Sequence, residues 1–179
     1  MKIAIFGGSF DPVHLGHEKV VNVALNTLDI DKLIILPTYI SLFKENFSAS
    51  PKLRISWLEK IFTKSDKLII SDYEVKQNRP VPSFDSVMYF KNLLNPSLIY
   101  FIIGADHLKT LHKWHNYEEL SKNVVFVIAS RDNIFIPNDY LKLDINEDIS
   151  SSFIRDNLVL EKVNPKIKDE VKEFYKGKK

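Results

Sequence analysis

The start of the chain places a glycine pair between an apolar run and an amphipathic segment. Residues 3–6 read Ile-Ala-Ile-Phe, Gly7 and Gly8 follow, and residues 15–28 carry apolar side chains at the spacing of a helix face. A short apolar strand that turns through glycines into a helix is the first half of a βαβ unit, and such a unit needs a parallel partner strand. This stretch therefore predicts a parallel α/β sheet.

The rest of the chain repeats the alternation of strand and helix. Apolar runs predict buried strands at residues 32–36, 67–70, 98–103 and 124–128. Helices are expected from residue 51, over 84–94, over 108–114, over 151–158 and after Pro165. An extended loop is expected over 72–83, and one or two edge strands are expected in 134–137 and 140–143. We predict an α/β fold with a Rossmann-like doubly wound parallel sheet, in one domain over 1–179 whose residues 150–179 form a C-terminal helical part.

Composition limits the classes of function. The net charge of +2 over 179 residues gives no argument for a nucleic-acid partner or a membrane partner. The absence of cysteine excludes disulfides and thiolate metal sites and favours the reducing cytoplasm. No apolar run approaches the length of a membrane span, and the strand at residue 3 leaves no room for a signal peptide.

The segment from Gly7 to His17 has the residue types of a phosphate site. Gly7 and Gly8 let the backbone approach a ligand closely, and unpaired N–H groups at a helix start attract anions. His14 and His17 add donors that can be charged or neutral near pH 7. Two histidines at i and i+3 could instead hold zinc, but no third ligand stands at a convincing spacing, so no protein metal site is predicted.

Residues 8–17, Gly-Ser-Phe-Asp-Pro-Val-His-Leu-Gly-His, resemble the signature of the nucleotidyltransferase superfamily that includes the adenylyltransferases. Members of that superfamily move AMP from ATP onto a phosphate and release pyrophosphate. The resemblance implies that His14 and His17 bind ATP phosphates, with His17 stabilising charge on the α-phosphoryl group. It implies further ATP contacts from Gly7, Gly8, Ser9 and Phe10.

A second motif follows at residues 149–155, Ile-Ser-Ser-Ser-Phe-Ile-Arg. Three hydroxyls at a helix start and an arginine one turn later could bind outer phosphates, although a serine cap with a surface arginine would look the same. The run is similar to the I-S-S-T-x-I-R motif of nicotinate-nucleotide adenylyltransferases. That similarity implies ATP contacts from Ser150, Ser151 and Ser152 and a catalytic Arg155.

Three further stretches carry the same resemblance. Gly104, Asp106 and Trp114 fit a G-x-D-x-L-x-x-L-x-x-W pattern, which implies that the first two lie near the ribose and that Trp114 stacks on the pyridine ring; a core position for Trp114 is the alternative. Lys44 fits the end of a P-x-x-x-P-P-H-K loop and implies a catalytic phosphate contact, but Phe43 replaces the histidine. Substrate contacts are assigned to Ser83, Phe84 and Ser86, in a segment that departs from the family pattern by two residues.

The resemblance implies an enzyme that uses ATP with Mg²⁺ and nicotinate mononucleotide to make deamido-NAD and pyrophosphate in NAD biosynthesis. Nicotinamide mononucleotide and pantetheine phosphate are alternative substrates, and a nucleotide-binding module without chemistry is an alternative class. The sequence leaves open a homo-oligomer and the roles of His107, His112 and His115.

Overall fold

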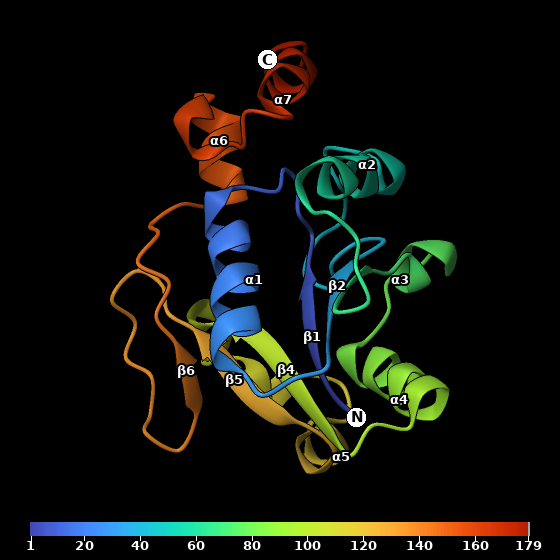
Figure 1. The fold of residues 1–179 in the computed structure, drawn as a ribbon. Helices are drawn as coiled ribbons and strands as arrows, with labels where there is room; N and C mark the ends of the chain where they lie inside the picture. The colour runs from blue at the N-terminus through green and yellow to red at the C-terminus, as the bar shows by residue number, and fades with distance from the viewer. Residues whose placement is uncertain (179) are drawn as a thin grey trace.

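Within residues 1–178, which the computed structural model describes, six parallel strands form one sheet with helices on both faces (Figure 1). The strands are β1 (Lys2–Gly8), β2 (Lys32–Pro37), β3 (Leu68–Ile70), β4 (Leu98–Gly104), β5 (Val125–Ala129) and β6 (Leu141–Leu143), in the order β3-β2-β1-β4-β5-β6. This order confirms the predicted Rossmann-like doubly wound sheet.

The strands at the centre of the sheet are apolar on both faces because helices cover both. Along β1 the side chains alternate between two cores, with Ala4 and Phe6 in one and Ile3 and Ile5 in the other. The first core is closed by α1 (Leu15–Thr27), α2 (Pro51–Ile61), α6 (Ser151–Asn157) and α7 (Lys168–Lys176). The second is closed by α4 (Ser83–Leu94) and α5 (Tyr117–Asn123).

The loop at the carboxyl end of β1 is where the C-terminal part of the chain packs. Figure 1 shows α6 and α7 at that end of the molecule, close to the start of α2. Ser50 caps α2 by accepting a hydrogen bond from the Leu53 amide, as its position before Pro51 predicts. No helix of residues 1–178 combines the length and the apolar character needed to cross a bilayer.

Two local predictions were wrong, and one open alternative was settled. Residues 73–76 form the short helix α3 (Tyr73–Lys76) inside the expected extended loop, because Pro80 and Pro82 restrict only their immediate predecessors. The helix expected over 108–114 is replaced by two 3-10 turns, η1 (Ala105–His107) and η2 (Leu111–Lys113). Of the alternatives of one or two edge strands, the structure has one, β6, and residues 134–137 form none, since Pro137 has no N–H to donate to a ladder.

Candidate active site

Two cavities adjoin at the carboxyl ends of β1 and β4. The larger has a volume of about 530 Å³ and the smaller about 190 Å³. Both are lined by Gly7, Gly8, Ser9, Gly104, Asp106 and His107. β1 and β4 are neighbours at the point where the strand order reverses, which is where doubly wound sheets bind their ligands. The predicted glycine loops of the two strands therefore meet between two compartments.

Gly8 and Gly104, two of the glycines at this boundary, have side chains of other residues close to the position of a Cβ, whereas Gly7 has ordinary space. A Cβ on Gly104 would lie 2.4 Å from Oδ1 of Asp106, and one on Gly8 would lie 3.1 Å from the ring of Phe10. Phe10 itself is buried and has a left-handed backbone, with φ of 50°. A left-handed backbone is costly for an aromatic residue and persists only where its surroundings enforce it, as they do at many functional sites.

His14 and His17 stack face to face in the smaller cavity. Their ring centroids are 3.7 Å apart, and the ring of His17 also meets that of Phe10 at 4.9 Å. The backbone N–H of His14 donates to Nδ1 of His17 over 3.2 Å. A neutral imidazole that accepts at Nδ1 carries its proton at Nε2, so His17 retains Nε2–H as a donor for a ligand.

Both imidazoles are neutral at pH 7 in the absence of a ligand. Burial lowers the pKa of His14 to about 3, with a smaller contribution from Arg131. Burial also lowers the pKa of His17 well below its usual value, followed by His14 and then Arg131. A bound phosphate would raise both pKa values, because an anion favours the protonated ring. The histidines therefore meet a ligand as neutral donors rather than as standing charges.

The sequence analysis missed Arg131, which follows β5 and lines the smaller cavity. Its guanidinium pairs with the carboxylates of Asp106 at 3.8 Å and Asp132 at 3.1 Å. The signal was available, since a polar residue just after a buried strand lies at the carboxyl edge of the sheet. Arg131 thereby adds a guanidinium, paired with these two carboxylates, to the lining of the smaller cavity.

A buried polar cluster, missed by the sequence analysis, joins the loop after β1 to the loop after β2. Asp11 accepts hydrogen bonds from the backbone amides of Ser48 and Ala49, at 2.8 and 2.9 Å, and from the hydroxyl of Tyr175 at 2.5 Å. Arg54 is 1% exposed and donates to three backbone carbonyls, those of Ser9 at 2.6 Å, Tyr39 at 2.7 Å and Ala49 at 3.0 Å. No local sequence pattern identifies these long-range partners.

The predicted phosphate residues on α6 sit directly behind the same loop. Nη1 of Arg155 donates to the carbonyl of Asp11 over 2.6 Å. Ser150 caps α6, and Ser151 donates to the carbonyl of Pro12 over 2.8 Å, while Ser152 is exposed and lies 3.1 Å from Ser150. The three hydroxyls thus have contacts within the protein, and their role as ATP ligands stays a prediction.

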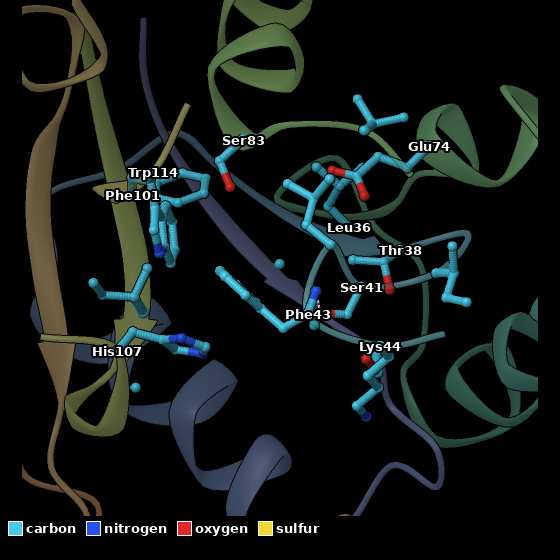
Figure 2. Close-up of a pocket in the computed structure, with 18 of the residues that line it drawn as sticks. Leu36, Thr38, Ser41, Phe43, Lys44, Glu74, Ser83, Phe101, His107 and Trp114 are labelled. Atoms are coloured by element: carbon cyan, nitrogen blue, oxygen red, sulfur yellow. Dashed lines mark hydrogen bonds between the residues drawn. The ribbon is translucent and has the colours of Figure 1, made fainter. Parts of the chain in front are cut away.

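Lys44 lies in the loop after β2 and lines the larger cavity (Figure 2). Burial lowers its pKa, and the charge of Arg155 lowers it further. Arg155 lines neither cavity, so its role beside Lys44 at the outer phosphates stays a prediction.

The larger cavity contains Trp114 and Ser83, two of the residues predicted to bind substrate (Figure 2). Trp114 packs against the second core, and its indole Nε1 is buried with no hydrogen-bond partner within residues 1–178. Phe84 and Ser86 are not among the lining residues: Phe84 packs on the second core, and Ser86 is 1% exposed. His107 and His115 line the cavity, whereas His112 does not.

Glu74 is a further cavity residue that the sequence analysis missed. It is 4% exposed, and its Oε1 accepts a hydrogen bond from Ser86 over 2.6 Å. Its other oxygen, Oε2, and the hydroxyl of Thr38 are buried with no partner in the described part of the chain. Burial raises the pKa of Glu74 to about 7, although the hydrogen bond from Ser86 opposes the rise.

Exchanging Glu74 for glutamine should remove one pH dependence of stability. Between the ordinary value of 4.5 and about 7, the unfolded carboxyl ionises while the folded one keeps its proton, so stability falls as pH rises. In denaturant titrations, the free energy of unfolding of the variant should rise relative to that of the native chain by up to about 3 kcal/mol between about pH 5 and about pH 8. A difference in unfolding free energy that is constant with pH would contradict this expectation.

The described residues gather no group of three or more histidine or carboxylate side chains that could hold a metal ion. His14 and His17 face one another by stacking rather than converging on a common point. The zinc alternative therefore gains no further ligand from the described residues.

The chain is similar in sequence to known nucleotidyltransferases. The model of the cytidylyltransferase-like family matches residues 5–157, so the chain belongs to that family of nucleotidyltransferases. Among curated relatives, a probable nicotinate-nucleotide adenylyltransferase of Campylobacter jejuni (strain RM1221) is 55% identical over 175 residues, which cover 98% of this chain and 97% of the relative. One of Aliarcobacter butzleri is 46% identical, with 100% of each chain covered. Within the wider family, the chain is a member of the nicotinate-nucleotide adenylyltransferases.

Solved structures agree with the fold. The nicotinic acid mononucleotide adenylyltransferase of Plasmodium falciparum, complexed with NaAD, superposes with a TM-score of 0.77 at 21% identity, over 97% of this chain and 95% of that one. A putative nicotinate-nucleotide adenylyltransferase of Vibrio parahaemolyticus gives a TM-score of 0.67 at 20% identity, over 95% and 97% of the two chains.

Proposed function

We propose that this protein transfers the adenylyl group of ATP to nicotinate mononucleotide, forming deamido-NAD and pyrophosphate as a step of NAD biosynthesis. The observation that carries the proposal is the pair of cavities that meet at Gly7, Gly8 and Gly104. One compartment for each nucleotide, with glycines where they touch, lets two phosphates come within bonding distance. The similarity to probable nicotinate-nucleotide adenylyltransferases supports the choice of substrate.

ATP is assigned to the smaller cavity, with His14, His17 and Arg131 around its phosphates. A phosphate oxygen of the mononucleotide attacks the α-phosphorus in line, a new P–O bond forms, and the bond to the β-phosphate oxygen breaks. Charge spreads over the α-phosphoryl oxygens as this happens, so a donor already fixed in place lowers the barrier. Nε2–H of His17 is assigned that role, since the His14 amide holds its ring.

Lys44 and Arg155 are assigned to the β- and γ-phosphates and to the departing pyrophosphate. This assignment would extend the outer phosphates beyond the smaller cavity, since Lys44 lines the larger cavity and Arg155 lines neither. Pyrophosphate carries several negative charges, and two cations neutralise it better than one. Nicotinate mononucleotide is assigned to the larger cavity, with its ring against Trp114 and its far end near Ser83 at the start of α4.

Mg²⁺ is proposed to enter with ATP. The ion prefers phosphate and water oxygens, and it commonly takes only one or two protein carboxylates. Asp106 and Glu147 line the smaller cavity and fit that limited contribution. The metal would neutralise phosphate charge, while His17, Lys44 and Arg155 position the phosphates.

Pyrophosphate release tests the function directly. The protein is offered ATP and Mg²⁺ with nicotinate mononucleotide, nicotinamide mononucleotide or pantetheine phosphate in separate reactions. The expected result is release with nicotinate mononucleotide at an efficiency, as kcat/KM, well above that with the other two. Release with none of them, while ATP still binds, would reduce the protein to a nucleotide-binding module.

A further inference from the structure

Phe43 occupies an unusual position for a phenylalanine. It lines the larger cavity from the loop after β2, yet it is 64% exposed, and Figure 2 shows its side chain extending across the cavity towards Trp114 and His107. Its ring centroid is 6.4 Å from that of Trp114 and 6.4 Å from that of His107, with interplanar angles of 42° and 34°. A large apolar side chain is thus presented to the interior of a ligand site.

The spacing between Phe43 and Trp114 is close to that needed to hold one flat ring. Carbon atoms of stacked groups make optimal contact at about 3.5–4.0 Å, so the outer members of a three-ring stack lie about 7 Å apart. Direct stacking elsewhere in the chain is much tighter, since Tyr73 and Tyr89 are 3.8 Å apart with an angle of 13°. Phe43 and Trp114 therefore do not stack directly, and their faces, now 42° apart, would have to turn towards parallel to accept a ring between them.

The chemistry of the substrate suits two aromatic walls. The pyridine nitrogen of nicotinate mononucleotide is bonded to ribose, so the ring carries a formal positive charge. An electron-poor cationic ring is attracted by the faces of aromatic side chains, and by two faces more than by one. Phe43 also directly precedes Lys44, so one short segment can contact the ring and a phosphate together.

We propose that Phe43 is a substrate-binding residue, whose ring closes over the pyridine ring of the mononucleotide opposite Trp114. The inference rests on the proposed function, because it takes the larger cavity as the mononucleotide site. His107 lies 5.5 Å from Trp114 at an angle of 75° and forms the edge of the same enclosure. The loop after β2 thereby contributes to recognition of the base as well as of phosphate.

Steady-state kinetics of Phe43→Leu and Phe43→Tyr test the inference. Leucine keeps apolar bulk but removes the aromatic face, so KM for nicotinate mononucleotide should rise about 3- to 10-fold, with KM for ATP within about twofold of native. Tyrosine keeps the face and should restore KM to within about twofold of native. Any activity with nicotinamide mononucleotide should weaken by a similar factor, because stacking recognises the ring and not its substituent.

Phe135→Leu serves as the matched control, since Phe135 is 80% exposed and lines neither of the two cavities. An unchanged KM for the mononucleotide in an active Phe43→Leu enzyme would overturn the inference. A lower KM would also overturn it, because it would show that the Phe43 side chain obstructs substrate binding. Failure of the native protein to release pyrophosphate with nicotinate mononucleotide would instead overturn the proposed function. The two failures are therefore distinguishable.

Discussion

Replacing His17 with alanine should lower kcat by about 10²–10³-fold, the usual cost of losing one preorganised donor to a charge that develops in the transition state. His17 has a ring held by the amide of His14 and by stacking, so its Nε2–H needs no reorganisation when ATP arrives. KM for both substrates should change much less, because the lost interaction strengthens as the reaction proceeds.

The measurement is steady-state pyrophosphate release, accompanied by a thermal melt that checks folding. His112→Ala is the control, because His112 is exposed and lines neither cavity. Native-like turnover in a folded His17→Ala enzyme would remove His17 from the mechanism.

Replacing Arg54 with methionine should lower the free energy of unfolding by about 3 kcal/mol or more. Methionine fills part of the volume but leaves the carbonyls of Ser9, Tyr39 and Ala49 without their donor, and each unpaired buried acceptor costs about 1–3 kcal/mol. Because Ser9 and Tyr39 belong to the two loops that line the active site, ATP binding should weaken as well.

Urea denaturation of the Arg54→Met and Arg79→Met variants makes this comparison. Arg79 is exposed, and within residues 1–178 its guanidinium donates only to the neighbouring Pro80 carbonyl, so its loss should change stability by less than about 0.5 kcal/mol. Equal stabilities for the two variants would show that the Arg54 contacts carry no net free energy.

The sheet could be predicted from the sequence because each of its central strands is a local signal. The runs at Ile3, Leu33, Ile99 and Val125 are apolar without alternation, which only a strand covered on both faces requires. The prediction of a helix after β4 was wrong because it also relied on a local signal. Leu108, Leu111 and Trp114 recur every three residues, and that spacing fits a pair of 3-10 turns as well as a helix.

In the candidate site, residues that are close in the sequence could be predicted to lie together, and residues that are far apart in the sequence could not. The glycines and histidines of residues 7–17 lie within eleven consecutive residues, so their proximity can be predicted from the sequence. Gly16 shows what was missed even there: a Cβ at this position would lie 3.0 Å from the ring of His14 and 3.3 Å from Ile149. Arg54 and Tyr175 reach the loop from 45 and 164 residues away, and no periodicity encodes such contacts.

The bond between Tyr175 and Asp11 also fixes when the active site can be completed. The loop that carries Asp11 is translated before the helix that carries Tyr175, so a growing chain contains the first before the second exists. Until then the carboxylate of Asp11 lacks one of its three donors, and Arg155, which donates to the Asp11 carbonyl, is also late in the chain. The loop that carries Asp11 is thus translated before two of the side chains that fix its hydrogen bonds, those of Arg155 and Tyr175.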